Sequence, residues 1–235
     1  MFFDSGYLPI LLVTLALGGA TQLYIKSTFS RWSQVPNSRG LTGAQVAQTI
    51  LDANGIAARV GESTGEGRVG ISAIAGHLTD HYDPRTGVVS LSDPVYGERT
   101  IAAAAVAAHE VGHAIQDAED YAWGELRTRI VPVVNFGSSI AGVLIIFGIF
   151  TSLAGLIWLG VLGYATAVLF QVVTLPVELN ASRRALVHLE SNGLLEAGEV
   201  GGAKQVLTAA ALTYVAGALI AILNLVYYIG LARRN

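Results

Sequence analysis

The chain has 235 residues, of which 52% are hydrophobic and 13% are charged, and its formal net charge is −3. Ordinary soluble domains carry about a quarter charged residues, so the composition argues against that class. The mild negative charge gives no indication of a nucleic-acid partner, which would favour a basic surface. Because the chain has no cysteine, disulfides and thiolate metal ligands are excluded. A metal site would have to use His, Asp, Glu or water.

Three long stretches contain no Asp, Glu, Lys, Arg or His, namely residues 5–25, 130–177 and 205–232. A helix needs about 20 apolar residues to cross a bilayer. The first and last stretches therefore predict one transmembrane helix each, and the middle stretch predicts a helical hairpin that turns near Thr151 and Ser152. The first stretch is neither preceded by positive charge nor followed by a small-residue cleavage site, so we expect an uncleaved anchor rather than a signal peptide.

The polar segments between these stretches are residues 26–129 and 178–204. Lys26, Arg31 and Arg39 follow the first predicted span, and positive residues favour the cytoplasmic side. We therefore expect both polar segments in the cytoplasm and the N-terminus outside. Four spans would leave the C-terminal pair Arg233–Arg234 outside, which opposes this orientation unless the last stretch does not cross the bilayer.

The segment 26–129 predicts a small mixed α/β domain. A helix is expected in LTGAQVAQTILDANG, where Thr42 and Gln45 have capping-box spacing and Gly55 provides a stop signal. Short β-prone runs follow at residues 56–60, 69–74 and 88–91. Turn-forming residues at 83–87 predict a hairpin that leads into the last run. This last strand, VVSLS, could be an edge strand that pairs with an extended peptide substrate.

The sequence AVAAHEVGHAIQ contains the pattern H-E-x-x-H at His109, Glu110 and His113. The alanine-rich run before it strongly favours a helix. On a helix the two imidazoles lie one turn apart on one face, and both can bind a zinc ion at about 2.0–2.1 Å. Glu110 would then act as general base toward zinc-activated water. Gly112 faces away from the ligands and would let another element pack closely. A structural histidine pair is the alternative interpretation.

A catalytic zinc site usually has three protein ligands and one open position. Glu178 is the leading candidate for the third ligand, because it directly follows the uncharged stretch and a carboxylate there is costly without a partner. Zinc would provide that partner. An ion pair with Arg183 or Arg184 is the alternative explanation for Glu178. Three histidines compete for the role of third ligand, namely His188, His77 and His81.

Three segments together, GHLTDHYDPRTGVVSLS, AVAAHEVGHAIQ and PVELNASRRAL, resemble the YugP-like family of neutral zinc metallopeptidases in bacterial membranes. The resemblance spans nearly the whole chain. The chain is also similar, more distantly, to HtpX-type membrane proteases and CAAX prenyl proteases, which carry a downstream E-x-x-A-D motif. The resemblance implies that Glu178 is the third zinc ligand. Ser182 stands where those relatives have an Asp that orients a zinc-binding His, so Asn180 or Ser182 would have to take over that role.

Further residues have several possible roles. His77, Asp80, His81 and Asp83 could bind substrate, support the zinc site, form a separate metal site, or simply belong to a polar hairpin. Arg183 and Arg184 could stabilise the oxyanion of a tetrahedral intermediate or support the metal site, or they could anchor the helix at the cytoplasmic surface. His188 could pack on the helix surface or support a ligand.

Taken together, these patterns predict a predominantly α-helical membrane protein with about four transmembrane helices and a small cytoplasmic α/β zincin-like domain that carries the H-E-x-x-H helix. We expect a zinc metalloendopeptidase with one catalytic zinc ion in the bacterial plasma membrane. Its substrate would be a peptide or membrane protein, in processing or quality control. The alternatives are a non-catalytic zinc-containing scaffold or adaptor, and a zinc hydrolase that acts on a lipid or a small amide. The patterns do not indicate an oligomeric state.

Overall fold

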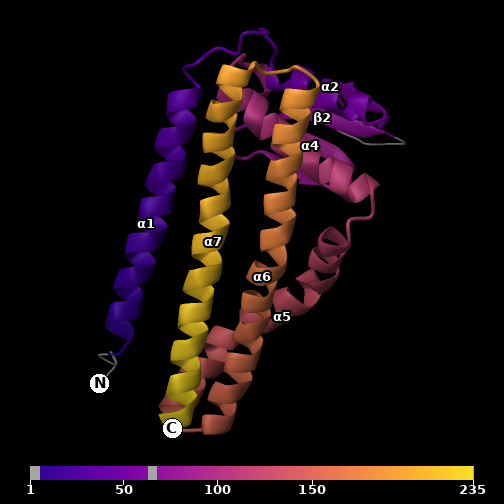
Figure 1. Ribbon diagram of the computed structural model, residues 1–235. Coiled ribbons are helices and arrows are strands. Elements are labelled where there is room, and N and C mark those ends of the chain that lie inside the picture. Colours follow the sequence, from indigo (N-terminus) through magenta and orange to yellow (C-terminus); the bar gives the residue numbers. More distant parts are fainter. Residues whose placement is uncertain (1–5, 63–67, 235) are drawn as a thin grey trace. The chain divides into compact units, whose positions relative to one another are not determined.

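The computed structural model describes residues 6–62 and 68–234 and is mostly helical, with one small sheet (Figure 1). Ser5, the first residue of the first predicted span, lies outside the described residues. Among the described residues, four helices are long and apolar enough to cross a membrane, which confirms the predicted number of candidate spans. They are α1 (Tyr7–Trp32), α5 (Ala122–Thr151), α6 (Ala154–Ser191) and α7 (Ala197–Arg234).

The chain forms two compact units, which are described separately below. The helical unit comprises residues 1–22, 122–176 and 212–235, and the mixed unit comprises residues 23–121 and 177–211. Helices α1, α6 and α7 contribute residues to both units. Helix α6 continues without interruption past Glu178, so the predicted boundary between the hairpin and the next polar segment falls inside a single helix.

In the helical unit, α5 and α6 approach each other closely at glycine residues. A Cβ atom on Gly163 would lie only 2.6 Å from the carbonyl oxygen of Gly137, and one on Gly160 would lie 2.9 Å from the carbonyl oxygen of Ala141. Such close backbone approach is typical of membrane helices. Large apolar side chains cover much of the outer surface, as expected for lipid contact. Examples are Leu12, Leu15, Phe136, Phe150 and Leu162.

The mixed unit contains a four-stranded sheet with the order β1-β2-β4-β3. Its strands are β1 (Ala58–Val60), β2 (Val69–Ile74), β3 (His81–Asp83) and β4 (Val88–Ser92). Strands β1, β2 and β4 are parallel, and β3 pairs antiparallel with β4, which confirms the predicted hairpin. The prediction that VVSLS is an edge strand is wrong. All five residues of β4 are buried, and the strand lies between β2 and β3 in the sheet.

Between the end of α1 and Ala122, the described part of the mixed unit also contains the helices α2 (Gly43–Ala53), α3 (Asp93–Gly97) and α4 (Ile101–Ala118). The capping box of α2 is confirmed, because the Thr42 hydroxyl accepts a hydrogen bond from the Gln45 backbone and the Gln45 side chain accepts one from the Thr42 backbone. The Thr100 hydroxyl caps α4 in the same manner by accepting from the Ala103 backbone at 3.2 Å. The short helix α3 was not predicted from the sequence.

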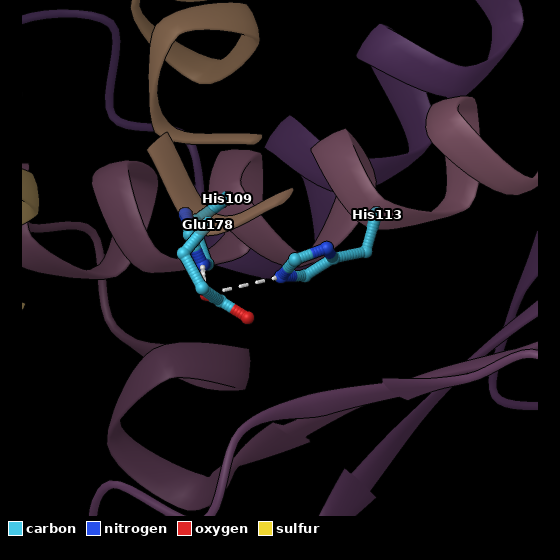
Figure 2. A group of neighbouring side chains, drawn as sticks. All are labelled: His109, His113 and Glu178. Atoms are coloured by element: carbon cyan, nitrogen blue, oxygen red, sulfur yellow. Dashed lines mark hydrogen bonds and ion pairs between the residues drawn. The ribbon is translucent and has the colours of Figure 1, made fainter. Parts of the chain in front are cut away.

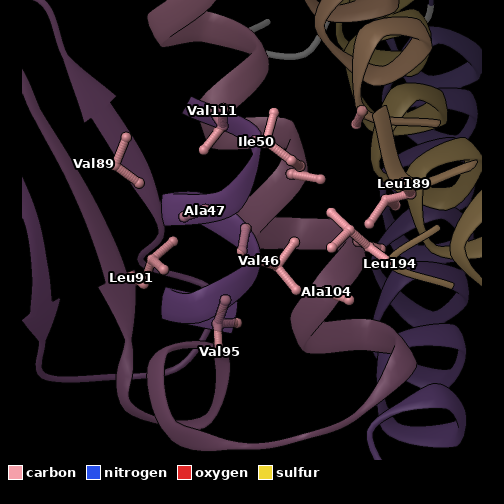
Figure 3. Close-up of a cluster of buried hydrophobic side chains, with 14 of the residues drawn as sticks. Val46, Ala47, Ile50, Val89, Leu91, Val95, Ala104, Val111, Leu189 and Leu194 are labelled. Atoms are coloured by element: carbon pink, nitrogen blue, oxygen red, sulfur yellow. The ribbon is translucent and has the colours of Figure 1, made fainter. Parts of the chain in front are cut away.

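The core of the mixed unit lies around α4 (Figure 3). Val46 of α2, Val89 of β4 and Val111 of α4 are completely buried in it. Leu189, near the end of α6, is buried in the same cluster. Full burial of such a side chain contributes about 1.5–3 kcal/mol. The core therefore holds the C-terminal part of α6 against α4, and this arrangement positions the candidate site.

Candidate metal centre

Two histidines of α4 and one glutamate of α6 meet inside the mixed unit (Figure 2). The Glu178 Oε2 atom lies 3.3 Å from His109 Nε2 and 3.5 Å from His113 Nε2. The candidate ligand atoms all lie within 4.8 Å of one another. Within the described part of the chain, this is the one such group of three or more His, Asp or Glu side chains. The structure thus brings together the three residues that the sequence predicted as metal ligands.

Gly112 explains how α6 comes so close to α4. A Cβ atom at this position would lie 2.8 Å from the carbonyl oxygen of Ala181 and 3.1 Å from its Cα atom. Any residue larger than glycine would therefore press against the backbone of α6, three residues after Glu178. The expectation that Gly112 lets another element pack closely is confirmed. That element is α6, which carries Glu178.

The geometry and chemistry of this group fit zinc. Tetrahedral ligand atoms that lie 2.0–2.2 Å from zinc are separated by about 3.3–3.5 Å, and both distances from Glu178 to the imidazoles fall in this range. Two histidines and a glutamate form a known ligand set of catalytic zinc. His109 and Glu178 are buried, with 9% and 4% of their surface exposed, so each needs polar partners that a bound cation would provide.

The second ring nitrogen of each imidazole also has a partner. The Ser182 hydroxyl lies 3.2 Å from His109 Nδ1, and Gln116 Oε1 lies 3.0 Å from His113 Nδ1. Histidines that bind a metal usually donate a hydrogen bond from their other nitrogen, which fixes the tautomer and the ring orientation. Ser182 therefore contacts the imidazole at the position where the more distant relatives carry an aspartate.

The sequence analysis did not identify Gln116. It follows His113 by three residues and therefore lies on the same face of α4, a spacing that could have indicated the contact. Its Nε2 atom donates hydrogen bonds to the Val177 carbonyl and to Asn180 Oδ1, both at 2.9 Å. Gln116 thereby connects the second histidine to the turn of α6 that contains Glu178.

Glu110 is buried next to this group, with 8% of its surface exposed. Burial raises the pKa of its carboxyl group, and the charges of Asp80 and Glu178 act in the same direction, whereas the two imidazoles oppose the increase. Asp80 is itself fixed, because its carboxylate accepts hydrogen bonds from the Ser92 backbone at 2.7 Å and from the Ser92 hydroxyl at 3.0 Å. Glu110 is thus a carboxyl group with a high proton affinity, adjacent to the candidate ligands.

The predicted hairpin residues lie outside the three-residue group. His77 and His81 are exposed, and the Nδ1 atom of His81 lies 2.9 Å from the Thr79 carbonyl. The Asp83 carboxylate accepts hydrogen bonds from Arg85, its neighbour in the turn. These contacts are local to the hairpin, and a role in substrate binding stays a prediction.

The remaining predicted residues lie further along α6. Arg183 is exposed, and His188 is half-buried and outside the three-residue group. Arg184, by contrast, donates hydrogen bonds to Asn180 Oδ1 and to Glu119 Oε2, both at 2.7 Å. The ion pair of Arg184 is with Glu119, and the Glu178 carboxylate lies against both imidazoles.

Comparison with known proteins shows the family to which the chain belongs. Residues 7–233 match the model of the family described as "Putative neutral zinc metallopeptidase". The chain belongs to this family. It is also 43% identical over 223 residues to the "Putative membrane protease YugP" of Bacillus subtilis (strain 168), with 95% of each chain covered. No solved structure matches the chain. The resemblance inferred from the sequence is therefore confirmed for this member of the zinc metallopeptidase family.

Proposed function

We propose that the protein is a membrane-anchored zinc metallopeptidase that hydrolyses peptide bonds. His109, His113 and Glu178 would hold one zinc ion, and Glu110 would be the general acid and base. The observation that carries the proposal is the position of Glu178, whose carboxylate reaches both imidazoles although it lies 69 residues after His109 in the chain. A ligand set assembled from two distant elements next to an additional buried carboxyl group is typical of a catalytic site.

The chemistry can be assigned to the residues of the chain. Zinc, when bound, acts as a Lewis acid that polarises the scissile carbonyl and makes water a better nucleophile at neutral pH. Glu110 accepts a proton from the attacking water as the oxygen bonds to the carbonyl carbon. Glu110 then delivers this proton to the amide nitrogen as the carbon–nitrogen bond breaks, which leaves a carboxylate and an amine.

We further propose that substrate is cleaved near the cytoplasmic surface of a bacterial membrane. Glu178 is the first charged residue after the uncharged stretch 130–177 of the sequence, which supports a site close to the end of a membrane span. Lys26, Arg31 and Arg39 support the cytoplasmic side. The pair Arg233–Arg234 at the end of α7 opposes this orientation. A substrate close to the membrane would be a membrane-protein segment or a peptide released from one.

The test combines metal analysis with hydrolysis. Protein purified in detergent should contain about one zinc per chain and cleave a casein-like substrate, and a chelator should abolish cleavage. Glu110→Gln should keep the metal and lose activity by at least about 100-fold, because general base catalysis contributes 10²–10⁴-fold. Glu190→Gln, the same change at an exposed position on α6, is the control variant. Full activity of Glu110→Gln would refute the assigned mechanism.

The same experiment separates the alternatives. A scaffold or adaptor would retain zinc without hydrolysing any substrate, in the wild type as well as in Glu110→Gln. A hydrolase for lipids or small amides would leave casein intact and cleave an ester or amide probe, and this activity would depend on Glu110 and zinc. The buried Glu110 favours the catalytic alternatives, since a purely structural zinc site needs no additional base.

A further inference from the structure

We propose that Gln116, Asn180 and Arg184 form a hydrogen-bond relay that positions His113 for metal binding. The relay has three consecutive contacts, all inside the mixed unit. Arg184 Nε donates to Asn180 Oδ1 at 2.7 Å, Gln116 Nε2 donates to the same oxygen at 2.9 Å, and Gln116 Oε1 lies 3.0 Å from His113 Nδ1. This inference rests on the proposed zinc site and assigns Arg184 as a positioning residue.

The direction of every hydrogen bond in the relay follows from the chemistry of Arg184, at which the relay begins. A guanidinium group has donors and no acceptor, so Asn180 must present its oxygen to Arg184. The same oxygen requires a donor from Gln116, and the Val177 carbonyl, which can only accept, requires one too. The amide nitrogen of Gln116 therefore faces α6, and its oxygen faces His113.

The consequence for His113 is a defined tautomer. Because an oxygen atom of Gln116 faces Nδ1, this nitrogen must carry the proton, and Nε2 retains the lone pair that a metal ligand needs. Nε2 is the atom that lies 3.5 Å from Glu178 Oε2. Arg184 thus acts on His113 through two amide side chains without touching the ligand. Its bond to Glu119, a residue with 54% of its side-chain surface exposed, adds an attachment at the end of α4.

Two nearly isosteric substitutions distinguish this directional relay from ordinary packing. Asn180→Asp keeps an acceptor oxygen toward both donors, so its zinc affinity should stay within about threefold of the wild type. Gln116→Glu replaces the donating NH2 group with a carboxylate oxygen, which faces the Val177 carbonyl and the Asn180 oxygen. These two oxygens accept hydrogen bonds and cannot donate one to the carboxylate. We expect Gln116→Glu to weaken zinc binding about 10–100-fold, the usual cost of losing a partner of a metal-binding histidine. Competition with a chromophoric chelator measures both affinities without any activity assay.

Arg184 is tested against its neighbour. Arg184→Gln should weaken zinc binding about tenfold, whereas Arg183→Gln, a change of the same type at an exposed position on the same helix, should have no effect. In the Asn180→Leu background the relay is already interrupted, so adding Arg184→Gln should cause no further loss. The visible spectrum of the cobalt-substituted protein should report a distorted ligand geometry in the weakened variants. Circular dichroism of the metal-free variants verifies that each one is folded.

Several outcomes would overturn the relay. Wild-type zinc affinity in Gln116→Glu, equal losses in Asn180→Asp and Gln116→Glu, or additive losses in the double variant would each contradict it. If these results occurred while the wild type bound zinc and hydrolysed peptides, the proposed function would stand and only the relay would be refuted. A wild-type protein with no zinc affinity would overturn both.

Discussion

Gly112→Ala is the sharpest test of the way in which the site is assembled. The added Cβ would lie 2.8 Å from the Ala181 carbonyl oxygen, about half an ångström closer than ordinary van der Waals contact. Such overpacking costs about 1–3 kcal/mol, and the higher helix propensity of alanine offsets about 1 kcal/mol of it. The net change in the free energy of unfolding should therefore be small, between about zero and 2 kcal/mol of destabilisation.

Zinc affinity should change much more than stability. Relief of the overlap moves α6 away from α4 by about half an ångström, and Glu178 lies on α6 three residues before the contact. Metal–ligand distances tolerate only about 0.2 Å, so the third ligand would no longer fit and affinity should fall by at least tenfold. Calorimetric titration with zinc and chemical denaturation of the metal-free protein measure the two effects separately.

The control for this variant is Gly201→Ala. A Cβ atom at Gly201, in the part of α7 that belongs to the mixed unit, would meet nothing within 4 Å. This variant should gain up to about 1 kcal/mol of stability from helix propensity and bind zinc like the wild type. If Gly112→Ala also bound zinc like the wild type, the argument that close approach at this glycine positions Glu178 would be refuted.

Three further predictions follow from contacts in the mixed unit. Ser182→Ala should weaken zinc binding about tenfold in chelator competition, because His109 loses the partner of its Nδ1 atom. Zinc at 100 times its dissociation constant should stabilise the protein by about 2.7 kcal/mol, and a chelator should reverse this in thermal denaturation. Tyr82→Phe should cost about 1 kcal/mol near neutral pH, because the hydroxyl donates to Asp117 at 2.8 Å. Burial and this bond raise the pKa of Tyr82, so its contribution is complete below about pH 10, the ordinary tyrosine pKa, and declines as the pH rises from there toward the raised pKa of the folded state. In urea denaturation, the stability difference between the two proteins should therefore shrink progressively above about pH 10.

Local patterns predicted the elements of the structure well, because local chemistry decides them. The capping box at Thr42 and Gln45, the hairpin around Asp83 and the uncharged stretches were each sufficient to define an element. The strand order could not be obtained in this way. The sequence VVSLS is compatible with an exposed edge strand and with a central strand, and its central position depends on parallel pairing with β2 in addition to its hairpin partner β3.

The three candidate metal ligands could be predicted because each of them has its own signal in the sequence. His109 and His113 follow from their spacing, and Glu178 follows from the cost of a carboxylate beside an apolar run. Gln116 was not identified, and support of the metal site was only one of several roles considered for Arg184. An amide three residues after a histidine and an arginine next to a membrane span both have common alternative explanations. Only the hydrogen bonds between α4 and α6 in the folded structure distinguish the roles of Gln116 and Arg184 from those alternatives.

The site also explains why polar residues concentrate on two consecutive turns of α6. Between Val177 and Arg184 this helix presents a carboxylate to the candidate metal position, an amide and a guanidinium group to the relay, and a hydroxyl to His109. Each of these groups is buried or half-buried and would be destabilising alone. They are compatible with the core because each has a partner on α4, and the closest of these contacts depend on a glycine that allows the two helices to meet. A cation bound by ligands from both helices would stabilise the contact between α4 and α6, and this contact brings the ligands together. Metal binding and the packing of α6 on α4 should therefore be coupled.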